Sequence, residues 1–297
     1  MMNFNTEMAA LGAACLWAVS SVIYSRLGQR LPPLELNLLK GAIAIPLLVF
    51  TLYLSRDVLP SVHPTALCLL LLSGVIGISV GDTAFFATLN DLGARRALLI
   101  ETLAPPIAAV IARIFLQERL SAGAWCGILL TILGVAWVIA ERVPGASDVN
   151  THWMRGIGFG LVAALSMATG AVLSHAVLAT TEISPLWAAL LRISAGVLLL
   201  LPSAWLRWQQ RRFEIKALHL KVIGGVFLAA FIGTYLAIWM QQTALKSTAA
   251  GISLTLTSTS PLFVLLIAAC MGERVSLRAI LGVLIAIGGI GLLFSLR

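Results

Sequence analysis

The sequence predicts an all-α membrane protein in which ten transmembrane helices form two inverted five-helix repeats. Three observations predict this fold class: the composition, a series of apolar segments and an internal duplication. Of 297 residues, 60% are hydrophobic and only 11% are charged, and the mean hydropathy is +1.00. Charged residues make up about a quarter of ordinary soluble domains. The chain has too few charged side chains to cover a water-facing surface, which excludes a soluble enzyme or a nucleic-acid-binding protein.

Ten apolar segments approach the length of about 20 residues that a helix needs to cross a bilayer. They span residues 7–27, 34–54, 65–90, 94–116, 122–140, 156–178, 186–206, 218–245, 247–271 and 277–296. The loops between them are too short to hold a soluble domain. The most polar stretch, residues 143–153, divides the chain into a first repeat (residues 1–145) and a second repeat (residues 146–297).

The two halves resemble each other when the sequence is shifted by 155 positions, which moves Thr102 onto Thr257. The same shift aligns proline, glycine and charged residues, which a shared apolar composition does not explain. These pairs are Pro106 with Pro261, Glu118–Arg119 with Glu273–Arg274, Gly127 with Gly282 and Gly134 with Gly289. Because five spans are an odd number, the second copy must enter the bilayer from the opposite side. Inverted repeats of this kind typically form a binding site near the midplane and change access by rocking.

Two stretches carry a resemblance to a known family, one from Leu103 to Gly127 and its repeat from Ser260 to Gly282. Each combines a proline-containing helix, a Glu-Arg-x-Ser hairpin and a glycine-containing closing helix. In these features the chain resembles the EamA family of the drug/metabolite transporter superfamily. The resemblance implies a secondary transporter of the cell (inner) membrane, often an exporter of amino acids or other small metabolites. It also implies a central cavity lined by helices of both repeats.

Three ionisable residues of the first half, Lys40, Asp82 and Glu101, lie inside apolar segments. Charged residues inside spans are costly and usually face the bundle interior, where they carry function. At about 1.5 Å per residue, Asp82 and Glu101 lie about 12–15 Å below the same surface, with Lys40 slightly shallower. We therefore expect one network, in which Asp82 and Glu101 are candidate proton carriers or counter-ions for a cation. The alternative is a neutralised group that only fixes helix packing.

The second half has no acid at the matching positions, because Asp82 aligns with Ala237 and Glu101 with Leu256. It offers other candidate substrate-binding residues and a hydroxyl-rich run at residues 253–260. A cavity that is acidic on one side and cationic and amide-lined on the other suits a zwitterion or a polar organic solute. The alternative is helix packing by small residues. The candidates, with two aromatic residues from the first span, are Arg192, Tyr235, Trp239, Gln241, Gln242, Trp17 and Tyr24.

The scattered Cys and His residues indicate no metal site and no cofactor. The expected partners are a small-molecule substrate and the lipid bilayer, with no nucleic acid; the oligomeric state stays open between monomer and homodimer. One alternative function is an intramembrane enzyme, because Gly81-Asp82 resembles part of a GxGD motif, but Ser79 replaces its first glycine. Another is an assembly or sensor subunit without transport of its own. We expect a transporter and not an enzyme.

The distribution of Lys and Arg predicts the orientation in the membrane. They gather in the loops that follow the first, third, fifth, seventh and ninth spans. The positive-inside rule places those loops in the cytoplasm and both termini outside, whereas the family resemblance implies termini inside. If the charge distribution decides, a tag at either terminus will react with a membrane-impermeant reagent in intact cells. Labelling that requires permeabilised cells would contradict this orientation.

Overall fold

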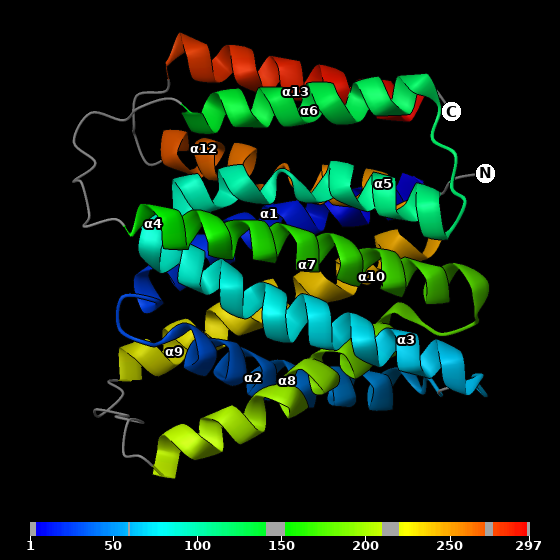
Figure 1. The fold of residues 1–297 in the computed structure, drawn as a ribbon, viewed down its shortest axis with the longest axis vertical. Coiled ribbons are helices and arrows are strands. Elements are labelled where there is room, and N and C mark those ends of the chain that lie inside the picture. Colours follow the sequence, from blue (N-terminus) through cyan, green and yellow to red (C-terminus); the bar gives the residue numbers. More distant parts are fainter. Residues whose placement is uncertain (1–3, 59, 141–151, 210–219, 271–275, 296–297) are drawn as a thin grey trace.

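The computed structural model describes residues 4–58, 60–140, 152–209, 220–270 and 276–295, which form helices and turns with no strand among them (Figure 1). The first half contains α1 (Phe4–Leu27), α2 (Pro33–Ser55), α3 (Pro64–Gly74), the π-helix η1 (Val75–Asp82), α4 (Thr83–Glu101), α5 (Ala104–Phe115) and α6 (Ala122–Ala140). The second half contains α7 (Trp153–Thr180), α8 (Pro185–Gln209), α9 (Leu220–Ala230), the π-helix η2 (Phe231–Leu236), α10 (Ala237–Ser247), α11 (Ala250–Thr257), α12 (Ser260–Cys270) and α13 (Leu277–Ser295).

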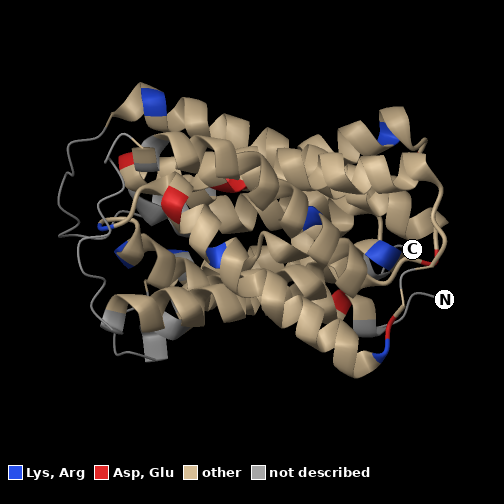
Figure 2. Cartoon of the chain, turned by 90° about the horizontal axis from the view of Figure 1, so that it is seen from below, with Lys and Arg blue, Asp and Glu red and all other residues tan. Residues whose placement is uncertain are grey.

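Six helical segments, three in each half, are long and apolar enough to cross a membrane. They are Thr6–Leu27, Pro33–Ser55, Pro64–Leu92, Trp153–Thr180, Pro185–Leu206 and Val222–Ser247. Each half also holds two shorter apolar helices: Ala104–Phe115, Ala122–Trp137, Ala250–Val264 and Ile280–Leu292. The all-helical membrane class is therefore confirmed, while the count of ten spans stays a prediction. Charged residues gather at the two ends of the bundle and few lie between them (Figure 2).

The chain reverses direction within α4, where the sequence predicts the turn between the third and fourth spans. Leu92 packs against Gly156, near the start of α7. Gly81, which precedes Leu92 in the sequence, packs against Ser166 of α7. Ile100, which follows Leu92, packs against Gly160 of α7. The chain thus runs antiparallel to α7 before Leu92 and parallel to α7 beyond it. The residues at this turn remain within α4, so no separate loop joins the two directions of the chain.

Two of the expected spans, residues 94–116 and 247–271, are not continuous helices. A turn at residues 102–103 separates α4 from α5, and a turn at residues 258–259 separates α11 from α12. Prolines follow both turns, and proline cannot donate a helical hydrogen bond. The turns lie at nearly equivalent places in the two repeats, and so do η1 and η2. The duplication seen in the sequence therefore extends to local departures from α-helical geometry.

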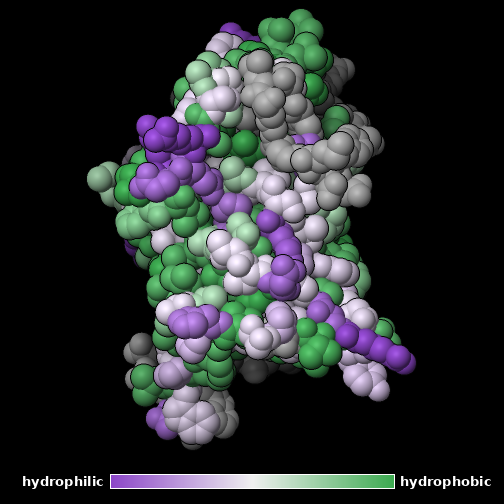
Figure 3. Space-filling view, turned by 90° about the vertical axis from the view of Figure 1, so that its right-hand side faces the viewer, coloured by the Kyte–Doolittle hydropathy of each residue, from purple (hydrophilic) through white to green (hydrophobic). Residues whose placement is uncertain are grey.

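The two repeats run in opposite directions and pack into each other. The start of α1 and the end of α13 lie at one end of the bundle, whereas α7 starts at the other end (Figure 1). The first helix of each repeat packs mainly in the other repeat: α1 contacts α9 to α12, and α7 contacts α3 to α5. Seen from the end with the termini, hydrophilic side chains cross the middle of the molecule among apolar ones (Figure 3).

The crossing of α3 and α8 requires a glycine at position 74. A Cβ atom there would lie 2.1 Å from the backbone oxygen of Arg192. We expect Gly74→Ala to destabilise the protein by about 1–3 kcal/mol, the usual cost of overpacking. In the matched control Gly158→Ala, the new Cβ meets nothing within 4 Å, and a gain in helix propensity of up to about 1 kcal/mol is expected. Thermal unfolding in detergent measures both, and equal midpoints would contradict the close crossing.

Candidate functional site

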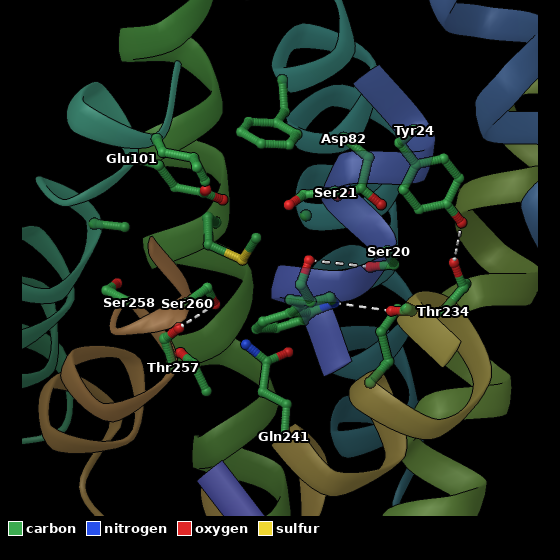
Figure 4. Close-up of a pocket in the computed structure, with 18 of the residues that line it drawn as sticks. Ser20, Ser21, Tyr24, Asp82, Glu101, Thr234, Gln241, Thr257, Ser258 and Ser260 are labelled. Atoms are coloured by element: carbon green, nitrogen blue, oxygen red, sulfur yellow. Dashed lines mark hydrogen bonds between the residues drawn. The ribbon is translucent and has the colours of Figure 1, made fainter. Parts of the chain in front are cut away.

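A central pocket lies between the two repeats, and helices of both form its wall. Its volume is about 110 Å³, which is room for several water molecules, since about 10–15 Å³ holds one. The wall combines aromatic and aliphatic side chains with hydroxyl, amide and charged groups (Figure 4). The hydroxyl, amide and charged lining residues are Ser20, Ser21, Tyr24, Lys40, Asp82, Glu101, Thr102, Arg192, Thr234, Gln241, Thr257, Ser258 and Ser260.

One face of α1 forms part of the wall and fastens it to η2 of the other repeat. The residues of this face recur at intervals of three and four and therefore lie on one side of the helix. The Trp17 indole Nε1 donates a hydrogen bond to the backbone oxygen of Gly233 at 2.8 Å, and the Tyr24 and Thr234 hydroxyl oxygens lie 3.1 Å apart. The face consists of Trp17, Ser20, Ser21 and Tyr24.

A buried ion pair joins Lys40 of α2 to Asp82, the last residue of η1. The side chain of Lys40 is 6% exposed and that of Asp82 15% exposed, so water screens the pair only weakly. The Lys40 ammonium also lies 4.9 Å from the centre of the Phe86 ring, at the distance of a cation–π contact. The sequence expectation that Lys40 and Asp82 meet at depth is confirmed.

Glu101 lines the same pocket but is not part of that ion pair. It is the last residue of α4, directly before the turn at residues 102–103. In the described part of the chain it has neither a hydrogen bond nor an ion pair, and the charge on Asp82 acts on it through space. Of the expected three-residue network, Lys40 and Asp82 are therefore bonded to each other. The carboxylate of Glu101 faces the same pocket without a bond to either of them.

The second repeat contributes Arg192 of α8 and Gln241 of α10 to the pocket. Arg192 is only 2% exposed, and its guanidinium lies beside Gly77, where a Cβ atom would approach its Nη2 to 3.1 Å. The hydroxyl-rich run reaches the pocket through Thr257, Ser258 and Ser260. The acids of the site thus come from the first repeat, whereas this arginine and amide come from the second.

Three further candidates do not line this pocket. Tyr235 points toward α2, where its hydroxyl lies 2.6 Å from that of Thr51. Trp239 packs with Tyr235 in an apolar cluster between α2, α8 and α10, with the two ring centres 6.1 Å apart. Gln242 is fully buried, points away from the pocket toward α7 and accepts a hydrogen bond from Ser174. Adjacent positions on a helix point about 100° apart, so they cannot all face the same space.

Several lining residues were not among the sequence candidates: Ser20, Ser21, Phe85, Phe86, Met167 and Thr234. The two serines could have been found, because they complete the helical face that begins at Trp17 and ends at Tyr24. Phe86 and Met167 carried no such signal, since aromatic and thioether side chains occur throughout the apolar segments. Among the described residues, no group of three His, Cys, Asp or Glu is placed to hold a metal ion.

Contacts between the two repeats lie between the pocket and the end that holds the termini. Gly251 of α11 packs so closely on α5 that a Cβ atom would lie 2.7 Å from the Cβ of Ala109. Glu118, in the turn after α5, lies 2.8 Å from the His175 Nε2 of α7, and His175 Nδ1 contacts the backbone oxygen of Leu245. Glu118 of the Glu-Arg-x-Ser hairpin is thus held by a residue of the other repeat.

The sequence matches the EamA-like transporter family over residues 5–140 and 154–295, which coincide with the two repeats. A solved crystal structure, described only as that of a protein, has a similar fold with a TM-score of 0.78. The two chains share 16% identity, and the likeness covers 99% of this chain and 98% of the other. No curated protein matches the sequence. The family match confirms the resemblance seen in the two duplicated stretches.

The buried ion pair yields a test of the pocket's electrostatics. Asp82→Asn leaves Lys40 charged and without its partner, so we expect a loss of about 3–5 kcal/mol in stability. The double variant Lys40→Met/Asp82→Asn removes the stranded charge and should recover most of that loss. Thermal unfolding in detergent provides the measurement, with the exposed Glu182→Gln as a control for the change of charge. Strictly additive losses would show that the pair is not coupled.

Proposed function

The chain belongs to the EamA-like transporter family, and from this premise we propose that it is a secondary transporter that exports a small polar metabolite, such as an amino acid. The protein is a multi-pass membrane protein, and we place it in the inner cell membrane. We further propose that transport proceeds by alternating access and is coupled to protons.

The pocket between antiparallel repeats carries this proposal. A transporter needs a site that each side of the membrane reaches in turn, and inverted repeats supply two related halves that can rock around it. The contacts of Gly251 and Glu118 described above join the repeats at the end that holds the termini. Opening that end requires the repeats to separate there, because each of these contacts joins one repeat to the other.

Proton coupling rests on the two carboxylates in the pocket. Asp82 is bonded to a lysine, whereas Glu101 faces the pocket without a bonded partner, and the two repel each other when both are charged. A proton or a cationic group on the substrate relieves this repulsion. Competition between the two for the same carboxylates would couple outward movement of the substrate to inward movement of protons.

Flux measurements test this coupling. Proteoliposomes carrying the wild type and a pH gradient should accumulate at least one member of a panel of radiolabelled amino acids. We expect Glu101→Gln and Asp82→Asn to lose accumulation against a gradient, because neither side chain can then release a proton. Exchange of the same solute down its gradient should persist in Glu101→Gln.

The exposed Glu182→Gln serves as the matched control and should behave as wild type. Unchanged proton-driven accumulation in both pocket variants would refute the role of Asp82 and Glu101 as proton carriers. Absence of flux in the wild type for the whole panel would count against amino acids as substrates.

A further inference from the structure

Arg192 carries a buried charge that has no hydrogen-bond acceptor among the described residues. Its Nε and Nη1 atoms are inaccessible to solvent and find no partner in the part of the chain that the structure describes. The residue is only 2% exposed and lines the pocket. Burying a charged group without a partner is costly, so a guanidinium in this position indicates that something else supplies its acceptors.

No carboxylate among the described residues is bonded to Arg192. Asp82 is the carboxylate, among the described residues, whose charge acts on Arg192. That carboxylate is already bonded to Lys40. Lys40 and Arg192 therefore share this one acid, and the guanidinium is left without a bonded carboxylate, while the unbonded Glu101 lines another part of the same pocket.

A second unpaired donor lines the same pocket. The Gln241 Nε2 atom is buried and has no acceptor among the residues described, and the Gln241 amide projects into the pocket (Figure 4). Every buried lining atom that lacks a partner in the described structure is a donor, on either Arg192 or Gln241. Unpaired donors require acceptor oxygens, and a guanidinium matches the two oxygens of a carboxylate.

We propose that Arg192, with Gln241, forms a recognition site for the carboxylate group of the transported solute. This inference deepens the proposed function and rests on it for the identity of the ligand as a substrate. Solutes that present a carboxylate are then selected over their neutral amides, and the apolar wall at Trp17 and Phe85 contacts the remainder of the solute.

Binding to the purified protein in detergent tests the site without any need for transport. The probes are three pairs of a carboxylate and its primary amide, which differ in size: acetate and acetamide, isovalerate and isovaleramide, and 3-phenylpropionate and 3-phenylpropanamide. Thermal stabilisation at rising ligand concentration and constant ionic strength gives the dissociation constants. For at least one pair, we expect the carboxylate to bind the wild type about tenfold or more tightly than the amide, because a hydrogen bond to a charged group is the stronger kind.

The variants assign this preference to the two donors. Arg192→Gln should bind both members of the pair equally, with the affinity for the amide unchanged, whereas Arg192→Lys should keep part of the preference. Gln241→Leu should weaken carboxylate binding less than Arg192→Gln does. Without ligand, Arg192→Gln should be at least as stable as the wild type, since it removes an unpaired buried charge; a purely structural arginine would make this variant less stable.

The outcomes separate this site from the proposed function. If no carboxylate binds the wild type more tightly than its amide, or if Arg192→Gln keeps the preference, the carboxylate site is overturned even when flux is observed. If the preference depends on Arg192 while no solute of the panel is transported, the site stands and the transport proposal fails.

Discussion

The backbone of a chain in lipid must satisfy its own hydrogen bonds, and the rest of this structure depends on that constraint. In the hydrocarbon region only helices and closed barrels meet it, unless irregular backbone lines a cavity. Here the two helix breaks and the two π-helices lie beside the central pocket, where Thr102, Ser258, Gly77 and Thr234 form part of the wall. These four departures from α-helical geometry therefore lie where polar backbone groups can find polar partners.

The same constraint acts on charge. Ionisable side chains at depth are tolerated when they pair or face a cavity, and the described residues show both solutions. Lys40 and Asp82 neutralise each other, while Glu101 and Arg192 face the pocket without a bonded partner. The pairing holds η1 against α2, and the two remaining charges give the pocket its chemical character. On the proposals above, Asp82 serves both stability and proton coupling, whereas Glu101 and Arg192 are left to interact with a bound solute.

Much of this architecture was predictable from the sequence, because composition and internal repetition depend on the solvent and on chain topology. The pairing of Lys40 with Asp82 followed from counting residues from a common surface. The breaks after Glu101 and Thr257 were not predicted, since hydropathy averages over a short turn. The orientation of Tyr235 and Trp239 away from the pocket was also not predictable, because the π-helix η2 changes the rotational phase of the residues within it and after it. His175 could not be identified as the partner of Glu118 without the packing of α7 against the first repeat.

The acids of the pocket lie on one repeat, and the arginine and amide lie on the other. Two identical subunits related by a two-fold axis would present the same groups to both ends of a bound molecule, which could then sit either way round. In this chain Ala237 and Leu256 stand where the first repeat has Asp82 and Glu101, so that degeneracy is removed. If the pocket binds the solute as proposed, a solute with unlike ends therefore has one preferred orientation in it.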